Sequence, residues 1–216
     1  VGVLEPQDMT PFLDALKTPL GTSFRITGTT DDPAAVHLRD YMERTHIDKM
    51  HNLVLRQEAL PAPKPIDWLP GRLCWRFDVS RSTLRGKGVA RGTGDDAVPP
   101  QPDTPEDTAA KRTIAAFHKF LVPEAEMGNI SRQEEVSMVP PACLDVRPGH
   151  RVIDMCAAPG SKTQQLVEAS TPPPSSTSAA AAFEGGYVIA NDSDYQRCHT
   201  LVHQVKRLNS SRLLGS

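Results

Sequence analysis

The chain has 216 residues and a formal net charge of −2, with 38% hydrophobic and 23% charged residues, a balance that excludes a uniformly disordered protein. Its longest stretch without charge or proline, residues 175–183, is far shorter than the roughly 20 apolar residues that a membrane helix needs. Proline accounts for 20 residues, and eleven of these fall in three clusters, at 61–70, 99–105 and 172–174, which therefore mark connecting segments.

Residues 1–85 carry an α+β pattern. Thr10-Pro11 is typical of a helix start, an N-cap residue followed by proline at the first helical position. Residues 23–27 alternate apolar and polar side chains as a half-buried strand does, and Asp32-Pro33 then begins a second helix that runs towards Thr45. We predict a small α+β accessory domain over 1–85.

Residues 86–109 contain glycine, proline and acidic residues with almost no apolar side chain, which predicts a disordered linker. Five acidic and two basic side chains place the net acidity of the chain here. The remainder is slightly basic, and arginines at Arg25, in 72–85 and in 206–212 could meet phosphates. Ordinary solvated surface charge is the alternative interpretation.

From Lys111 the pattern is helical up to Leu121. Residues 131–134 then fit the S-x-x-E capping box, which predicts a short helix that Pro140-Pro141 ends or bends.

Residues 151–155 are predicted to form a buried strand, followed by a tight loop and a helix over 162–168 that Ser161 caps. After a low-complexity insert at 170–184, residues 187–191 form the next strand, and Asp194 caps a helix with one apolar face. The apolar residues of that helix are Cys198, Leu201, Val202, Val205 and Leu208. Strand, loop, helix and strand predict an α/β, Rossmann-like sheet over 110–216.

The loop between the first strand and helix has the features of a ligand site, because ligands of such sheets bind beyond the carboxyl ends of the strands. It has a single glycine, Gly160, which disfavours a dinucleotide, and the spacing before Lys162 does not fit a P-loop. Asp192 could accept both hydroxyls of a ribose, and Asp154 could favour a cationic group. S-adenosylmethionine suits these features, and a purely structural junction is the alternative.

The chain shows no signal peptide, since its first residues have neither a basic region nor an apolar one, and we expect an intracellular protein. Its four cysteines, Cys74, Cys143, Cys156 and Cys198, follow no metal-ligand spacing. We therefore expect reduced thiols, with no disulfide and no structural zinc.

The segment Val152–Leu166, VIDMCAAPGSKTQQL, resembles the cofactor motif of the NOP/Sun-type RNA cytosine-5 methyltransferases, to which the DxCAAPGSK core is highly specific. Residues 117–121, 128–141 and 188–209 are similar to the eukaryotic tRNA branch of that family, as is Phe24-Arg-Ile-Thr-Gly28. The resemblance covers most of the chain outside 86–109 and 170–184.

The resemblance implies methylation of cytosine carbon-5 in RNA, with tRNA as the expected substrate, by a nuclear or nucleolar enzyme without any membrane association. It assigns S-adenosylmethionine binding to Cys156, Ala157, Ala158, Pro159, Gly160, Ser161, Lys162 and Asp192. The N-terminal region would help to hold the RNA. In that family a cysteine thiolate adds to carbon-6 of the cytosine, from a Pro-Cys or Thr-Cys motif on a later strand.

Neither of these cysteine motifs is present, so we expect a Rossmann-like methyltransferase fold truncated after its second strand and helix, with the nucleophile beyond Ser216. The chain alone is predicted to be inactive. A non-catalytic RNA-binding fragment and a different Rossmann-type binder, for instance of NAD, are the competing hypotheses.

Overall fold

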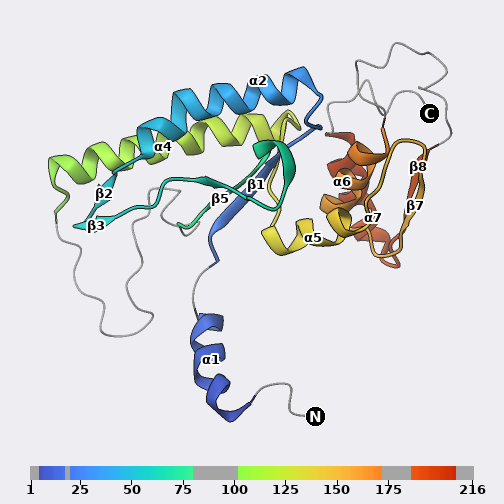
Figure 1. Cartoon of the computed structure of the whole chain (residues 1–216), viewed down its shortest axis with the longest axis horizontal. Helices are drawn as coiled ribbons and strands as arrows, with labels where there is room; N and C mark the ends of the chain where they lie inside the picture. Colours follow the sequence, from blue (N-terminus) through green and yellow to red (C-terminus); the bar gives the residue numbers. More distant parts are fainter. Residues whose placement is uncertain (1–4, 18–19, 80–101, 172–185, 208–216) are drawn as a thin grey trace.

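The computed structural model describes residues 5–17, 20–79, 102–171 and 186–207 (Figure 1). The predictions made for residues 86–101, for 172–184 and for Leu208 lie outside the described residues. So do those for Arg81, Arg85 and Arg212.

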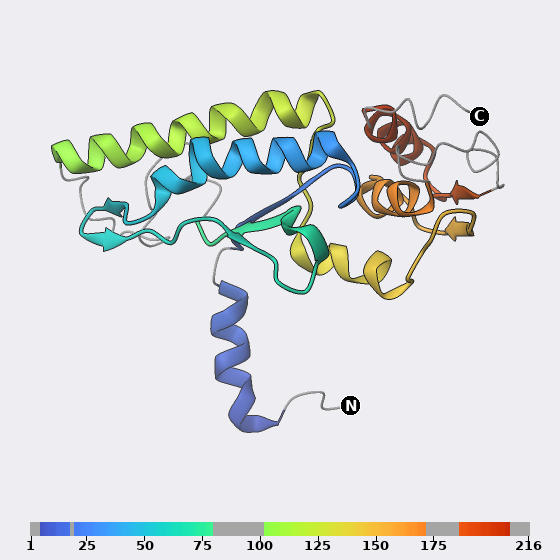
Figure 2. The same cartoon turned by 45° about the horizontal axis from the view of Figure 1, so that its top comes forward.

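The first half of the chain contains short strands between helices. Its elements are the 3-10 helix η1 (Pro6–Asp8), α1 (Met9–Lys17), β1 (Thr22–Ile26), α2 (Pro33–Met42), the π-helix η2 (Glu43–Ile47), the 3-10 helix η3 (Asp48–Met50), β2 (Val54–Leu55), β3 (Glu58–Ala59), β4 (Lys64–Pro65), the 3-10 helix η4 (Pro70–Arg72) and β5 (Cys74–Phe77). Helix α1 begins one residue before the predicted Thr10, has no buried residue, and projects away from the other elements in both views (Figures 1 and 2).

The second half places longer helices around short strands. Its elements are α4 (Pro105–Glu126), β6 (Ile130–Ser131), α5 (Glu135–Cys143), β7 (Arg151–Asp154), α6 (Ser161–Ser170), β8 (Tyr187–Ala190) and α7 (Tyr195–Lys206). None of the helices in the described ranges is long and apolar enough to cross a membrane.

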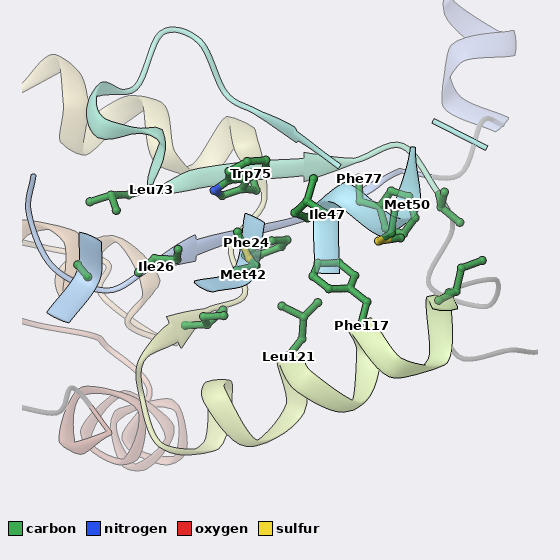
Figure 3. Packing of buried hydrophobic residues seen from close by; sticks show 14 residues of the cluster. Phe24, Ile26, Met42, Ile47, Met50, Leu73, Trp75, Phe77, Phe117 and Leu121 are labelled. Atoms are coloured by element: carbon green, nitrogen blue, oxygen red, sulfur yellow. The ribbon is translucent and has the colours of Figure 1, made fainter. Parts of the chain in front are cut away.

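A four-stranded antiparallel sheet in the order β4-β5-β1-β6 organises the first region. Phe24 of β1 lies opposite Trp75 of β5, and both side chains point to the face that α2 and α4 cover (Figure 3). Fourteen buried apolar residues form this core, among them Phe117 and Leu121 of α4. The ring of Phe117 packs edge-on against Phe24, with 6.0 Å between the ring centroids.

The opposite face of the sheet is also covered, because successive side chains of a strand alternate between faces. Cys74 follows this alternation. It packs with Ile66, the residue after β4, against Met138 of α5. Arg25, the register partner of Cys74, lies on the same face and is buried. The prediction that Arg25 is a surface contact for phosphates is therefore wrong, since a helix layer covers this face too.

Helix α4 corrects two predicted boundaries. It begins at Pro105, inside the segment predicted to be a disordered linker, because Thr104 and Asp107 form a reciprocal capping box. The carboxylate of Asp107 also accepts a hydrogen bond from the backbone N–H of Arg56 in the β2–β3 turn. Because α4 packs in the core and β6 pairs with β1, the accessory region does not end at residue 85 but continues through the first part of the predicted 110–216 domain.

The capping box predicted at 131–134 is not formed. Ser131 lies in β6, and α5 begins at Glu135 after Glu134, which makes no side-chain cap. Pro140 and Pro141 lie inside α5 rather than ending it. Pro141 has no N–H to offer the carbonyl of Ser137, which accepts a hydrogen bond from the side chain of Gln133 instead.

The second region is a parallel pair, β7 and β8, with α6 and α7 beside it. Helix α6 runs to Ser170, one residue into the predicted low-complexity insert. Strand β7 was predicted to be buried, yet Ile153 is 59% exposed and Ile189 of β8 is 50% exposed. The prediction is wrong because a parallel sheet is buried only when helices cover both of its faces, and here one face is open.

Candidate cofactor site

The loop from β7 to α6 packs closely against α7. Cys156 is exposed, whereas Ala157 and Ala158 are buried and pack against Leu201 of α7. Gly160, rather than Ser161, is the N-cap of α6, with a φ of 109° that side chains rarely adopt. A Cβ there would stand 3.0 Å from Leu201, so both the backbone and the packing require glycine.

The parallel register brings the ends of the two strands together. Asp154 pairs with Ala190, and the N–H of Asn191 donates to the carbonyl of Asp154 at 2.9 Å. The N–H of Ala157 donates in return to the carbonyl of Asn191 at 2.8 Å. The loop after β7 and the residues after β8 therefore meet at one end of the sheet, where ligands of such folds bind.

Asp192 is bonded directly to this loop. Its Oδ2 accepts the N–H of Ala158 at 3.1 Å, and its Oδ1 accepts the N–H of Asp194 at 3.1 Å. The Asp194 N–H holds the pKa of Asp192 below its usual value, with the Ala158 N–H and the cation of Arg197 adding to the effect against partial burial. The carboxylate is ionised at neutral pH, and its side chain is only 3% exposed.

Asp154 contacts the start of α6. Its Oδ2 accepts a hydrogen bond from the hydroxyl of Thr163 in the first turn of α6, at 2.7 Å. This contact fixes the start of α6 against the end of β7, while Ser161 and Lys162 remain half-buried.

The four cysteines differ in exposure. Cys143 and Cys156 are exposed, Cys198 is half-buried, and Cys74 is buried in the first region. Burial raises the pKa of the Cys74 thiol to about 11, with Glu168 adding to the effect and Arg25 opposing it. Cys74 is therefore a neutral packing residue. No group of three or more potential metal ligands occurs among the described residues.

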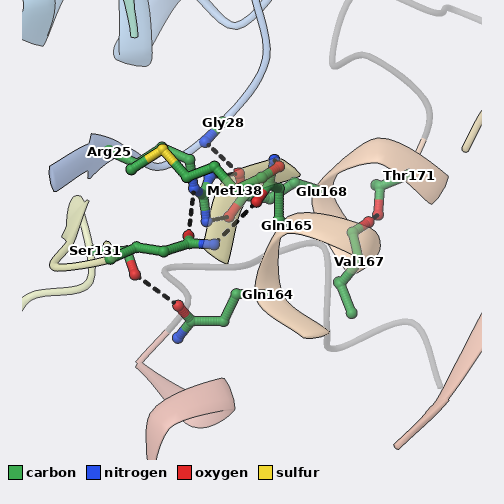
Figure 4. Close-up of polar contacts among 10 residues, drawn as sticks. Arg25, Gly28, Ser131, Met138, Gln164, Gln165, Val167, Glu168 and Thr171 are labelled. Atoms are coloured by element: carbon green, nitrogen blue, oxygen red, sulfur yellow. Dashed lines mark hydrogen bonds and ion pairs between the residues drawn. The ribbon is translucent and has the colours of Figure 1, made fainter. Parts of the chain in front are cut away.

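A buried polar network, which we call the junction, joins the first region to α6 (Figure 4). Both terminal nitrogens of the Arg25 guanidinium group face the carboxylate of Glu168, with Nη2 at 3.0 Å from Oε1 and Nη1 paired with Oε2. Glu168 Oε2 also accepts the N–H of Gly28 at 3.0 Å. The two charged side chains are 3% and 7% exposed, so each depends on the other for its charge compensation.

Two glutamines of α6 extend the junction. Gln165 accepts a hydrogen bond from Gln133 at 3.1 Å and donates to the carbonyl of Met138 in α5. Gln164 accepts one from the hydroxyl of Ser131 at 3.0 Å. The helix that begins at the loop glycine is thus held by side chains of β1 and β6, by Gln133 between β6 and α5, and by a backbone carbonyl of α5.

Sequence reasoning did not find the junction. One signal was available: Arg25 stands between Phe24 and Ile26 in a strand, and Gln164, Gln165 and Glu168 make one side of α6 polar. Those patterns indicate polar faces, but they cannot show that the two faces meet.

Among the described residues, two other arginines proposed as phosphate contacts are paired. Arg72 forms an ion pair with Glu43 and lies over the ring of Trp75. Arg76 pairs with Asp78 and Glu135. Two residues of the 206–212 segment are described. Lys206 is the last residue of α7, and Arg207 is its C-cap.

No protein-family model matches the chain. The chain is 39% identical over 212 residues to the multisite-specific tRNA:(cytosine-C(5))-methyltransferase of Saccharomyces cerevisiae, covering 98% of this chain and 26% of that protein. It is 35% identical over 213 residues to the tRNA (cytosine(34)-C(5))-methyltransferase of Drosophila melanogaster, covering 96% of this chain and 24% of that protein. The chain thus spans about a quarter of the length of these relatives.

Among solved structures, a methyltransferase homolog protein from Pyrococcus horikoshii matches with a TM-score of 0.50 at 22% identity, over 95% of this chain and 46% of that one. This likeness confirms the predicted fold class, an α/β chain with a Rossmann-like parallel pair of strands. With the relatives above, the resemblance to RNA cytosine-C5 methyltransferases found in the sequence is confirmed.

Proposed function

We propose that the protein serves S-adenosylmethionine-dependent methylation of cytosine carbon-5 in tRNA, and that this chain supplies the cofactor loop. The observation that carries the proposal is the loop from Cys156 to Lys162, folded between a parallel strand and a helix and hydrogen-bonded to Asp192. The kinship with tRNA methyltransferases supports the substrate.

The loop fits the cofactor at several points. Backbone N–H groups at the start of α6 and in the loop can meet polar groups of a ligand, and the left-handed conformation of Gly160 joins the loop to the helix. Asp192 is ionised, and a carboxylate has about four acceptor positions, so it can accept from ribose hydroxyls while keeping its two N–H bonds. When bound, S-adenosylmethionine would supply the methyl group as an electrophile.

We propose that the catalytic thiolate comes from residues beyond Ser216. Of the described cysteines, Cys74 is buried as a neutral thiol, and Cys198 packs in α7 with its Sγ against the Asp192 carbonyl. Cys156 lies in the proposed cofactor loop, where it would line the ligand rather than attack a base. By family resemblance alone, we also place the protein in the nucleus.

Calorimetric titration of the full chain with S-adenosylmethionine tests the proposal. We expect saturable binding that Asp192→Asn weakens at least tenfold, because a neutral amide is a poorer acceptor for two ribose hydroxyls. Asp145→Asn, the same change at an exposed turn, should bind like the wild type. Equal binding by all three proteins, or a preference for NAD, would contradict the assignment of the loop.

The alternative function is RNA binding without catalysis. The open face of β7–β8 favours it, because the sheet is incomplete in the described residues. A methylation assay tests this alternative. With S-adenosylmethionine and tRNA supplied, we expect no 5-methylcytosine from this chain, although tRNA is retained. Robust methylation would show that a nucleophile is present after all.

A further inference from the structure

A pocket of about 210 Å³ lies at the junction, beside the cofactor loop rather than within it. The first region contributes Thr27, Ser131 and Arg132 to its wall, and the second region contributes Ser161, Gln204 and Arg207. Of the residues assigned to the cofactor, only Pro159 and Ser161 reach this wall. The pocket is therefore a separate feature, formed where the two regions meet.

The lining of the pocket has the chemistry of an anion site. Its lining includes two arginines, Arg132 and Arg207, and three residues with hydroxyls, of which Ser131 donates its hydroxyl to Gln164. None of the lining residues, all of them in the described part of the chain, is acidic. Ser161 is the first residue of α6, where unpaired N–H groups and the helix dipole add positive potential.

Thr27 gives an independent indication of a ligand. Its Oγ1 is buried, and within the described residues it has no hydrogen-bond partner. A buried hydroxyl without a partner is uncommon in folded proteins, because losing its hydrogen bonds to water costs free energy. Thr27 also lines the pocket, and a change of its χ1 rotamer would turn this hydroxyl toward an acceptor bound there.

The size of the pocket restricts the ligand. Sites for whole drug-sized molecules measure roughly 300–1,000 Å³, whereas this pocket of about 210 Å³ has room for a single charged group. Arginine pairs with phosphate oxygens in bidentate geometry, and hydroxyls commonly complete such contacts.

We propose that the junction pocket binds one backbone phosphate of the RNA substrate, and so fixes the strand between the accessory region and the cofactor loop. This inference rests on the proposed function for the identity of the polymer. A free phosphate ion has the same chemistry, and the experiment distinguishes the two sources.

Fluorescence anisotropy with a tRNA transcript, over a series of salt concentrations, tests the pocket in the full chain. We expect Arg207→Gln and Arg132→Gln each to weaken binding about fivefold to tenfold, and to reduce the slope of log K against log salt by about one. The matched control is Arg112→Gln, an exposed arginine on α4. Arg112 lies 13 positions before the pocket residue Ala125, a separation of roughly 20 Å along a helix.

Thr27→Val is a second variant that tests the pocket if an arginine variant fails to fold. Because the change removes an unpaired buried hydroxyl and keeps the shape, the thermal midpoint should be unchanged or higher. The affinity for tRNA should nevertheless fall about threefold. A purely structural role for Thr27 would not lower affinity while stability is retained.

Titration with inorganic phosphate forms the second arm. Weak phosphate binding that Arg207→Gln abolishes, together with weakened tRNA binding, supports the proposal. Phosphate binding that depends on Arg207 without any effect on tRNA would overturn it, and so would an equal loss in Arg112→Gln. If the chain does not bind S-adenosylmethionine but the pocket variants still weaken tRNA binding, the proposed function is refuted and the phosphate site is retained.

Discussion

The two regions of the molecule differ in how they bury apolar surface. The first region encloses fourteen apolar residues between the sheet β4-β5-β1-β6 and the helices α2 and α4. The second region has a cluster of three buried residues, Ala157, Ala158 and Leu201, and Met155 beside it is 69% exposed. Since stability grows with the apolar area removed from water, the first region should account for most of it.

The difference shows what the junction does. The second region packs through polar contacts of α6, and Arg25 and Glu168 join it to the sheet of the first region. A site that depends on a cofactor loop gains a defined orientation from such contacts even where its own core is small.

Removing a large side chain from each core should have unequal effects. Phe117→Ala should lower the free energy of unfolding by about 4 kcal/mol, because it opens a cavity among fully buried rings. Leu201→Ala should cost about 2 kcal/mol, the lower end for such a change, because the cluster around it is small. Urea unfolding followed by circular dichroism measures both, and equal losses would contradict the comparison.

The stability lost when the ion pair of the junction is broken should be partly recovered by a second substitution. Arg25→Met leaves the carboxylate of Glu168 buried without a cation and should cost about 3 kcal/mol. Adding Glu168→Gln removes the uncompensated charge, keeps an acceptor for the N–H of Gly28, and should recover about 2 kcal/mol.

Hydrogen exchange provides the readout specific to the junction. In Arg25→Met the amides of α6 should exchange faster while those of α4 in the first core change less. A double variant no more stable than Arg25→Met alone would show that charge compensation is not what the pair contributes.

The smallest expected effect is a pH dependence in the first region. The N–H of Arg56 holds the pKa of Asp107 below its usual value, and the N–H and hydroxyl of Thr104 act in the same direction. A carboxylate with a lowered pKa contributes stability above the unfolded pKa of about 3.9, and that contribution is lost as the pH falls through the lower folded value.

The thermal midpoint of the wild type should therefore fall more steeply below about pH 4 than that of Asp107→Asn. Asp67→Asn, a change at an exposed residue, should follow the wild-type curve. If Asp107→Asn runs parallel to the wild type, the contacts between α4 and the β2–β3 turn do not depend on the charge of Asp107.

Local signals in the sequence predicted most elements that position the site. Asp194 caps α7 as expected, with its side chain accepting the N–H of Arg197, and β1, β7 and β8 lie within one residue of their predicted ranges. Caps and strand alternation depend on residues close in the chain, so a single sequence reveals them. The predicted capping box at Ser131 failed because that residue is drawn into β6 by its pairing with Arg25.

The resemblance to RNA cytosine-C5 methyltransferases, the α/β pattern and the loop after β7 follow from the sequence alone, because a motif such as Asp154 to Lys162 is a contiguous run whose backbone needs are local. Only the tertiary structure decided that α4 belongs to the first region, that Arg25 is buried against Glu168, and that a basic pocket opens between the regions. Arg25 and Glu168 are 143 positions apart, and such contacts follow from which faces meet once both regions are folded. That pairing is a property of packing, which no local pattern encodes.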